Sequence, residues 1–203
     1  AVSGGRFLAT MCGLLFMTFC EAGVDAQAAP WVQKNDGLYG ADIWSLAVNS
    51  SGHIFAGTYH MGVFRSSDNG DNWVRADSGT PGLSTANVRS LAVNSSGNVF
   101  AGTWYLGVFR SMDDGNSWTQ ISSGLNLNTY PDLAVNALVI NSSGVIFAGT
   151  GPGGMYRSFN NGDSWTQINS GLTNTTVFSL AVNSSGHVFA GTNDGLFRSV
   201  DNG

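Results

Sequence analysis

Residues 45–58 read Ser-Leu-Ala-Val-Asn-Ser-Ser-Gly-His-Ile-Phe-Ala-Gly-Thr, and close copies of this stretch recur along the chain. A step of about 45 residues indicates one supersecondary unit copied several times. The 203-residue chain is therefore expected to consist of repeats of one unit. The run Phe-Ala-Gly-Thr marks each copy and occurs at 55–58, 100–103, 147–150 and 189–192, in steps of 45, 47 and 42 residues.

The repeat unit has the pattern of four short strands separated by turns. Asn-Ser-Ser-Gly and Asp-Asn-Gly runs mark two tight turns, because Gly and Asn tolerate the backbone angles that hairpins need. Spacing alone also fits a β-solenoid, but turns of unequal length favour a radially packed blade. We therefore predict an all-β fold, a β-propeller of four-stranded antiparallel blades, with about three and a half to four blades in this chain. In the first repeat the expected strands are 44–48, 53–58, 62–66 and 73–76.

Each repeat also carries the pattern Ser-x-Asp-x-Gly-x-x-Trp, with an asparagine in the Asp position of the third copy and the last copy ending at its glycine. These motifs resemble the Asp-box (BNR) repeats of sialidase-like and sortilin-like β-propellers, over about residues 31–203. The carboxylate can accept N–H groups of its own turn, and the indole packs across the hairpin. The residues expected to have this structural role are Ser66, Asp68, Gly70, Trp73, Ser111, Asp113, Gly115, Trp118, Ser158, Asn160, Gly162, Trp165, Ser199, Asp201 and Gly203.

The repeat also predicts the domain organisation. Residues 31–38 align with 165–172, which indicates that the propeller domain, 29–203, opens with a lone outer strand. One interpretation, which we favour, is the N-terminal part of a propeller with roughly six to eight blades. The others are a four-bladed ring that closes within the chain, and association of several copies to complete a ring. The expected segments are the lone strand near 31–42, repeats at 43–87, 88–135 and 136–176, and an incomplete repeat at 177–203.

Residues 1–28 have the features of a secretory signal peptide. Arg6 precedes an apolar run of 13 residues, and a small-x-small site follows at 26–28. The run is shorter than the roughly 20 residues of a membrane span. Cys12 and Cys20 would leave with this segment, so the mature domain would contain no disulfide. This favours a secreted, periplasmic or cell-surface protein of bacterial type, without a membrane span.

The charge pattern argues against nucleic acid as a partner. The formal net charge is −5 and the only lysine is Lys34, so no basic stripe is available for nucleic acid. No pair of the three histidines has the spacing of metal ligands, and we expect neither a metal nor a cofactor.

Catalytic residues are not evident in the repeats. The only glutamate, Glu21, lies in the predicted signal peptide, so the tyrosine–glutamate pair of sialidases is missing from the mature chain. Xyloglucan-cleaving enzymes of similar repeat type use two aspartates, but nothing in the sequence places two of the non-box aspartates together. A glycoside hydrolase, sialidase-like or xyloglucanase-like, with its catalytic residues largely outside this chain stays the alternative. The aspartates outside the boxes that could contribute are Asp36, Asp42, Asp132 and Asp194.

Four arginines occupy one equivalent position, directly before the serine of each box. Equivalent placement on every repeat favours a role in stabilising the blades, or exposure to solvent, over recognition of a ligand carboxylate. These arginines are Arg65, Arg110, Arg157 and Arg198.

Specific function is expected where the repeats differ. The loops after Phe-Ala-Gly-Thr vary, and two of them are rich in aromatic residues that could stack on sugars or peptides. The alternative is that Trp104 and Tyr105 fold back over neighbouring strands. We predict an exported interaction module that presents these loops to a protein or glycan partner. Its candidate binding residues are Tyr59, His60, Trp104, Tyr105, Tyr130, Asn193 and Asp194.

Overall fold

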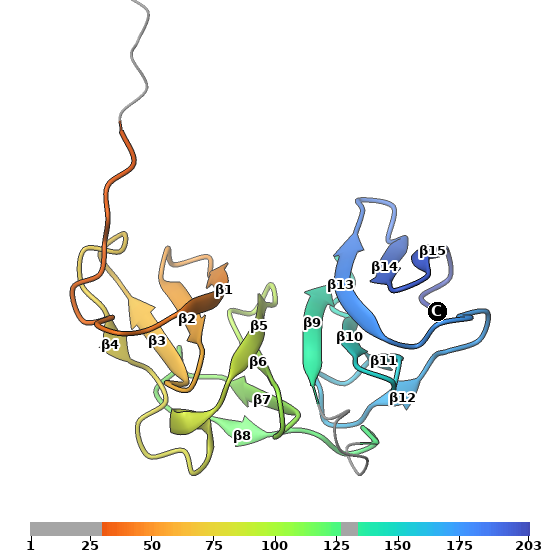
Figure 1. The fold of residues 1–203 in the computed structure, drawn as a ribbon, viewed down its shortest axis with the longest axis horizontal. Helices are drawn as coiled ribbons and strands as arrows, with labels where there is room; N and C mark the ends of the chain where they lie inside the picture. The colour runs from red at the N-terminus through yellow and green to blue at the C-terminus, as the bar shows by residue number, and fades with distance from the viewer. Residues whose placement is uncertain (1–29, 127–133) are drawn as a thin grey trace, which may run out of the picture. The chain divides into compact units, whose positions relative to one another are not determined.

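The computed structural model describes residues 30–126 and 134–203, which contain strands and one short 3-10 helix but no α-helix. Lys34–Gly203 form one compact unit. Within this unit the strands form four antiparallel sheets, three with four strands and one with three (Figure 1). The prediction of an all-β fold built from antiparallel blades is confirmed. The predicted signal peptide lies outside the described residues.

The strands of each sheet lie side by side in chain order. The first sheet contains β1 (Ile43–Val48), β2 (Ile54–Thr58), β3 (Val63–Ser66) and β4 (Val74–Arg75). The second contains β5 (Val88–Val93), β6 (Val99–Thr103), β7 (Val108–Ser111) and β8 (Thr119–Gln120). The third contains β9 (Val135–Ile140), β10 (Ile146–Thr150), β11 (Met155–Ser158) and β12 (Thr166–Gln167). The last contains β13 (Val177–Val182), β14 (Val188–Thr192) and β15 (Gly195–Ser199), and the 3-10 helix is Leu83–Thr85.

The first hairpin of every sheet closes in the same way. The side-chain oxygen of Asn49 accepts the N–H groups of Ser51 and His53, at 3.1 and 3.0 Å. Such local bonds satisfy backbone donors that the short turn would leave unpaired. The equivalent asparagines Asn94, Asn141 and Asn183 accept the corresponding N–H groups of their own turns.

The hydrophobic core lies between neighbouring sheets. Phe55 of the first sheet is fully buried in one cluster with Trp118 and residues of the second sheet. Phe100 is buried in the same way against the third sheet. The second and third sheets are covered by a neighbouring sheet on both faces. The first and last sheets have one neighbouring sheet each, so one face of each is less covered. Phe189 of the last sheet, equivalent to these phenylalanines, is accordingly only half-buried.

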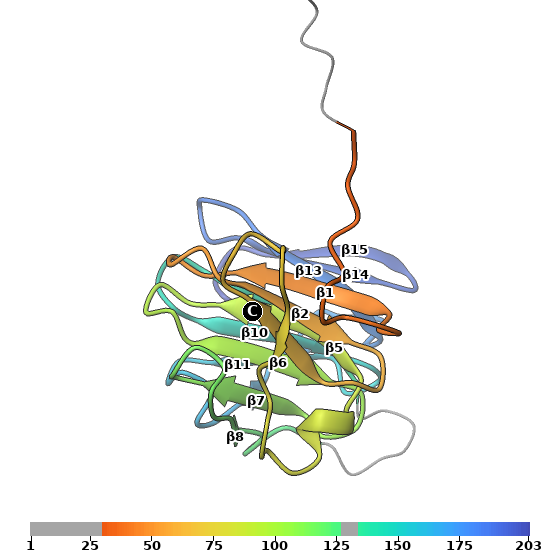
Figure 2. The same ribbon diagram turned by 90° about the vertical axis from the view of Figure 1, so that its left-hand side faces the viewer.

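The glycine of Phe-Ala-Gly-Thr allows the sheets to pack closely at their innermost strands. A Cβ atom on Gly102 would lie 2.7 Å from Cγ1 of Val135, the first residue of the next sheet. Gly57 meets Val88 and Gly149 meets Val177 in the same way. β1, β5, β9 and β13 therefore contact one another in order, as the innermost strands of propeller blades do (Figure 1). Figure 2 views the same sheets from the side of the first sheet.

Residues 31–42, predicted as a lone outer strand, pair with no sheet among the described residues. Their position in the fold nevertheless corresponds to a fourth strand. The carbonyl of Lys34 accepts the Trp73 indole N–H at 3.1 Å, as the carbonyl of Ile121 accepts that of Trp165 at 2.7 Å. The boundaries between repeats stay predictions.

Candidate ligand-binding site

The first strand of each sheet contains one residue that has no partner in the ladder. In the first sheet Ile43 lies opposite Thr58 and Ser45 lies opposite Gly57, so Trp44 is the extra residue of a β-bulge. Bulges bend a strand and redirect a side chain, and they are frequent beside functional sites. The equivalent bulge residues are Arg89, Asn136 and Phe178, so this position differs in all four sheets.

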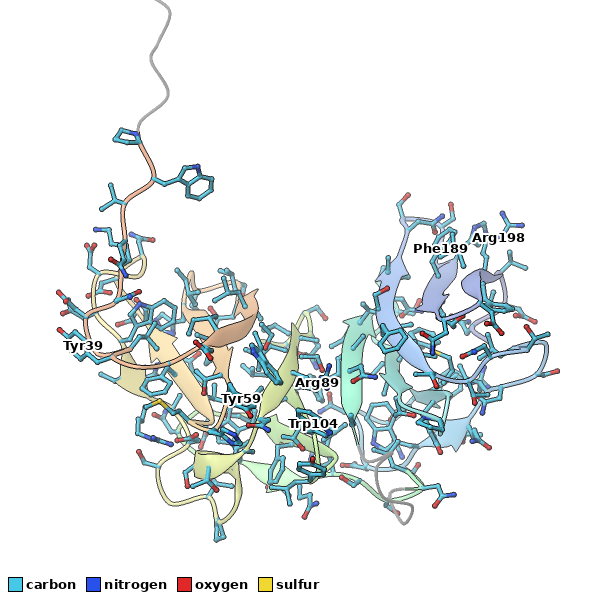
Figure 3. All side chains as sticks on the ribbon, viewed as in Figure 1. Tyr39, Tyr59, Arg89, Trp104, Phe189 and Arg198 are labelled. Atoms are coloured by element: carbon cyan, nitrogen blue, oxygen red, sulfur yellow. The ribbon has the colours of Figure 1, made fainter. Side chains whose placement is uncertain are left out.

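Two bulge residues meet the variable loops of the first two sheets. Trp44 contacts Tyr59 and Trp104, with ring centroids 4.8 and 6.1 Å apart. The Arg89 guanidinium carbon lies 5.4 Å from the Trp44 ring centroid and 4.9 Å from that of Trp104. Figure 3 shows Tyr59, Arg89 and Trp104 converging between the two sheets. We call Trp44, Tyr59, Arg89 and Trp104 the aromatic cluster.

The charge of Arg89 is the main electrostatic feature of the aromatic cluster. Partial burial lowers the pKa of its guanidinium, which stays protonated because arginine is a very strong base. The two indole faces attract this cation. Among the described residues, no carboxylate forms an ion pair with it. An anionic group of a ligand could therefore supply the charge-assisted hydrogen bonds that this guanidinium lacks.

A shallow depression of about 300 Å³ adjoins the aromatic cluster. Asn87 holds the two loops that border the depression. The side-chain oxygen of Asn87 accepts the His60 N–H at 2.7 Å, and the carbonyl of Asn87 accepts the Trp104 N–H at 3.0 Å. The His60 ring lies 3.7 Å from that of Tyr59, and the Tyr105 ring stacks at 5.4 Å on Trp104. His60 and Tyr105 line the depression, so the aromatic cluster continues into it.

The structure brings together four of the predicted binding residues and separates the others. Tyr59, His60, Trp104 and Tyr105 all belong to the aromatic cluster or the adjoining depression. Asn193 and Asp194 lie exposed in the turn between β14 and β15 of the last sheet, away from this site. Tyr130 falls outside the described residues.

Sequence reasoning missed Trp44 and Arg89. One position of the first strand differs in every repeat, whereas the residues after it are nearly the same in all repeats. This variation was the signal in the sequence that could have identified Trp44 and Arg89. The bulge that turns this position toward the loops is visible only in the ladder register.

The segments predicted as boxes form compact turns, which we call the box turns (66–73, 111–118, 158–165 and 199–203). In the first, Asp68 accepts the Ser66 hydroxyl at 2.7 Å and the Asn72 N–H at 2.9 Å. Hydrogen bonds from the Asn72 side chain, the Asn72 backbone and Ser66 lower the pKa of Asp68 to about 2. Asp113, Asn160 and Asp201 each accept the equivalent serine hydroxyl.

Arginines join the last three box turns to the preceding sheets. Nη1 of Arg65, Arg110 and Arg157 donates to the carbonyl of the positive-φ residue in the next box turn, at 2.5, 2.7 and 2.7 Å. Three of the four equivalent arginines therefore stabilise the contact between blades, as the sequence predicted. Arg198 lies exposed on the last sheet.

The aspartates considered for catalysis do not form a site among the described residues. Asp36 accepts the Tyr39 hydroxyl at 3.1 Å, and Asp42 is exposed before β1. Asp132 falls outside the described residues, and Asp194 is on the last sheet. In the part of the chain that the structure describes, no group of three or more potential metal ligands occurs and no helix is long and apolar enough to cross a membrane.

Neither a protein-family model nor a curated protein sequence matches the chain. Solved structures do match it. The extracellular domain of the one-component system BT4673 from B. thetaiotaomicron superposes with a TM-score of 0.66 at 19% identity, over 83% of this chain and 23% of that one. The chain has the β-propeller fold.

Two further propellers illustrate the range of functions on this scaffold. An ancestral GH74 enzyme matches with a TM-score of 0.64 at 23% identity, over 87% of this chain and 25% of that one. YCF48 bound to D1 peptide matches with a TM-score of 0.59 at 17% identity, over 75% of this chain and 49% of that one. The chain therefore spans about a quarter of the length of the first matched structures.

Proposed function

We propose that this propeller is an exported binding module that recognises a glycan or protein partner through the aromatic cluster. The observation that carries the proposal is the convergence of Trp44, Tyr59 and Trp104 around Arg89. Indole rings stack on sugars and on apolar side chains with little loss of conformational freedom. The guanidinium adds a preference for ligands that carry a carboxylate or another anionic group.

Features outside the site support export and binding. Residues 1–28 have the pattern of a signal peptide, and two of the matched structures are extracellular domains of B. thetaiotaomicron proteins. YCF48, another matched propeller, was solved with a bound peptide. The Asp-box character of the box turns belongs to the same proposal, because their internal hydrogen bonds suit a structural role.

Binding can be tested on the chain from residue 29 onward, with panels of acidic and neutral oligosaccharides and of acidic and neutral peptides. We expect a ligand to change tryptophan fluorescence, and Trp104→Ala to weaken binding about tenfold or more, because a central indole is lost. Phe159→Ala is the matched control, since Phe159 is an exposed aromatic residue of the third box turn outside the aromatic cluster.

The contribution of charge can be separated from that of stacking. Arg89→Gln removes the cation, and we expect it to reduce binding of acidic ligands while leaving binding of their neutral counterparts nearly unchanged. Added salt should weaken the same interactions. Equal binding by the wild type, Trp104→Ala and Arg89→Gln would contradict the proposed site.

A glycoside hydrolase with its catalytic residues outside this chain is the second candidate, favoured by the likeness to GH74 structures. Retaining or inverting hydrolysis needs two suitably spaced carboxyl groups. The full-length protein should then release reducing ends from polysaccharides, whereas the binding module alone would bind them without cleavage.

A further inference from the structure

Asn87 is a buried polar residue in the lining of the depression beside the aromatic cluster, with 7% of its surface exposed. Its side-chain oxygen accepts the His60 N–H, which leaves the two N–H groups of Nδ2 as donors. Among the described residues, no acceptor forms a hydrogen bond with Nδ2. A buried donor without an acceptor costs stability, so this atom needs a role that the fold itself does not supply.

Nδ2 of Asn87 is open to the depression and is not sealed inside the protein. In the part of the chain that the structure describes, the fully enclosed side-chain atoms without a partner are the Nε atoms of Arg65, Arg110 and Arg157. Because Asn87 lines the depression, an oxygen atom of a bound ligand can approach Nδ2 from there. The orientation of the amide is fixed, since only its oxygen can accept the His60 N–H.

The repeat does not require an asparagine at this position. The equivalent residues of the first, third and last sheets are Asp42, Ala134 and Thr176. What recurs is a backbone contact, because the Ala134 carbonyl accepts the Gly151 N–H at 3.1 Å in the same way as the Asn87 carbonyl accepts the N–H of its own loop. The backbone at this position therefore stabilises the blade, whereas the side chain is available for a specific site.

The surroundings of Nδ2 suit a sugar residue. A pyranose ring has C–H groups on its faces and oxygen substituents at its edge. The depression offers apolar surface from Ala86, Leu106 and the Tyr105 ring for such a face, and the Asn87 amide for an edge oxygen. Its volume of about 300 Å³ is at the lower end for ligand pockets and suits a single ring. The flexible side chain of an acidic peptide would present no such face.

A nearby cation narrows the class of sugar. Arg89 lies two residues after Asn87, and its guanidinium packs on the Trp104 ring, 4.9 Å from the centroid. A carboxyl group offers a carbonyl oxygen to the amide and a negative charge to the guanidinium. A uronic acid residue combines this group with a pyranose ring, so it matches both side chains.

We propose that the site recognises uronic acid residues of a glycan, and that Asn87 is its specificity-determining residue, donating from Nδ2 to the carbonyl oxygen of the carboxyl group. This inference rests on the proposed binding function and names its ligand. The hydrogen bond from Asn87 does not depend on the charge of the ligand, so it also forms with a methyl ester. Arg89 recognises the charge, and Asn87 recognises the carbonyl oxygen.

Three forms of one polymer separate these contributions: polygalacturonate, its methyl ester and its carboxyl-reduced form. The ester keeps the carbonyl oxygen without the charge, and the reduced polymer has neither. Titration calorimetry with the chain from residue 29 measures the affinity for each. We expect the wild type to bind polygalacturonate most tightly, and the ester about tenfold more tightly than the reduced polymer, because the reduced polymer leaves a buried donor unpaired.

Asn87→Ala removes the Nδ2 donors and should bind the ester and the reduced polymer nearly equally. Asn87→Asp should give the same result while it keeps an oxygen for the His60 N–H, and its added charge acts equally on two neutral polymers. Aspartate occupies the equivalent position of the first sheet, at Asp42, so this variant should fold. A residue that only held the loops would weaken binding of both polymers by one factor. An unchanged ratio of the two affinities in Asn87→Asp would therefore overturn the role of Asn87.

Arg89→Gln is the companion variant, and it should lose the preference for polygalacturonate over the ester while it keeps the preference for the ester over the reduced polymer. Failure of the wild type to bind any of the three polymers would overturn the inference. Binding of an acidic peptide that Trp104→Ala loses would then leave the proposed binding site in place. Equal binding of a polymer by the wild type and Trp104→Ala would instead contradict the proposed site itself.

Discussion

At the scale of single residues, the box turns use a carboxylate as a hydrogen-bond acceptor. Asp68 binds the Ser66 hydroxyl and the Asn72 N–H, and these bonds favour its charged form. In the third box turn Asn160 accepts the same two groups, from Ser158 at 2.9 Å and Ser164 at 3.0 Å. The turn therefore requires an acceptor oxygen at this position, and the negative charge of an aspartate only strengthens the hydrogen bonds that this oxygen accepts.

We predict that Asp68→Asn preserves the fold but removes part of the acid sensitivity of the protein. The folded pKa of Asp68, about 2, lies below its ordinary value of 3.8, so its stabilisation is present above pH 3.8 and is lost as the pH falls toward 2. The difference in melting temperature between wild type and variant should therefore shrink from pH 5 to about pH 2. A constant difference in melting temperature over this pH range would show that the charge of Asp68 does not contribute to stability.

At the scale of strands and sheets, close packing of the innermost strands depends on the glycine of each Phe-Ala-Gly-Thr run. Gly102 leaves room for Val135, and the valine covers the hairpin of the preceding sheet. The bulge lies one residue along the same strand, at Asn136 in the third sheet. The glycine–valine contact, which is the same in three repeats, and the bulge residue, which differs in every repeat, are therefore neighbours along one strand. The packing of the sheets can stay the same while the bulge residue beside it changes.

We predict that Gly102→Ala destabilises the domain by about 1–3 kcal/mol, the usual cost of overpacking. A Cβ atom there would lie 2.3 Å from Oγ of Ser90 and 2.7 Å from Cγ1 of Val135. Gly191→Ala is the matched control, because the three atoms nearest to a Cβ atom at that position all belong to Ser179 of the same sheet. Chemical denaturation measures the free energy of unfolding of both variants and of the wild type. Equal losses in the two variants would contradict a steric origin at the contact between sheets.

At the scale of the whole molecule, the sheets of Lys34–Gly203 form a row in which each packs mainly on its neighbours. Stability in such repeat architectures is approximately a sum of repeat and neighbour terms. The second and third sheets are covered on both sides, and every residue of β6 and β10 is buried. The first and last sheets are covered on one side, and most residues of β1 and β13 are at least partly exposed.

We predict that amide hydrogen exchange is slowest in β6 and β10 and fastest in β1 and β13–β15 in dilute solution, because opening an end sheet breaks one inter-sheet contact and opening a middle sheet breaks two. Exchange should be followed by mass spectrometry. Uniform exchange rates over all four sheets would contradict a row of separable sheets.

Much of the scaffold could be predicted from the sequence, because its determinants are local. Turn residues such as Asn49 and Asp68 bind groups within a few residues of themselves, and the alternation of apolar runs and turns marks the strands. The role of Arg65, Arg110 and Arg157 followed from their equivalent positions alone. The strand expected over 31–42 stays a prediction, because a strand needs a partner that its own residues cannot supply.

The sequence by itself determined the repeat, the strand order of each sheet and the loops in which specific residues would occur. Only the tertiary structure decided that Trp44 and Arg89 belong with Tyr59 and Trp104. Trp44 and Arg89 lie one repeat apart on the chain, and they meet because the innermost strands pack closely and a bulge turns each side chain toward the loops. A binding site made from two neighbouring sheets depends on contacts that no local pattern encodes.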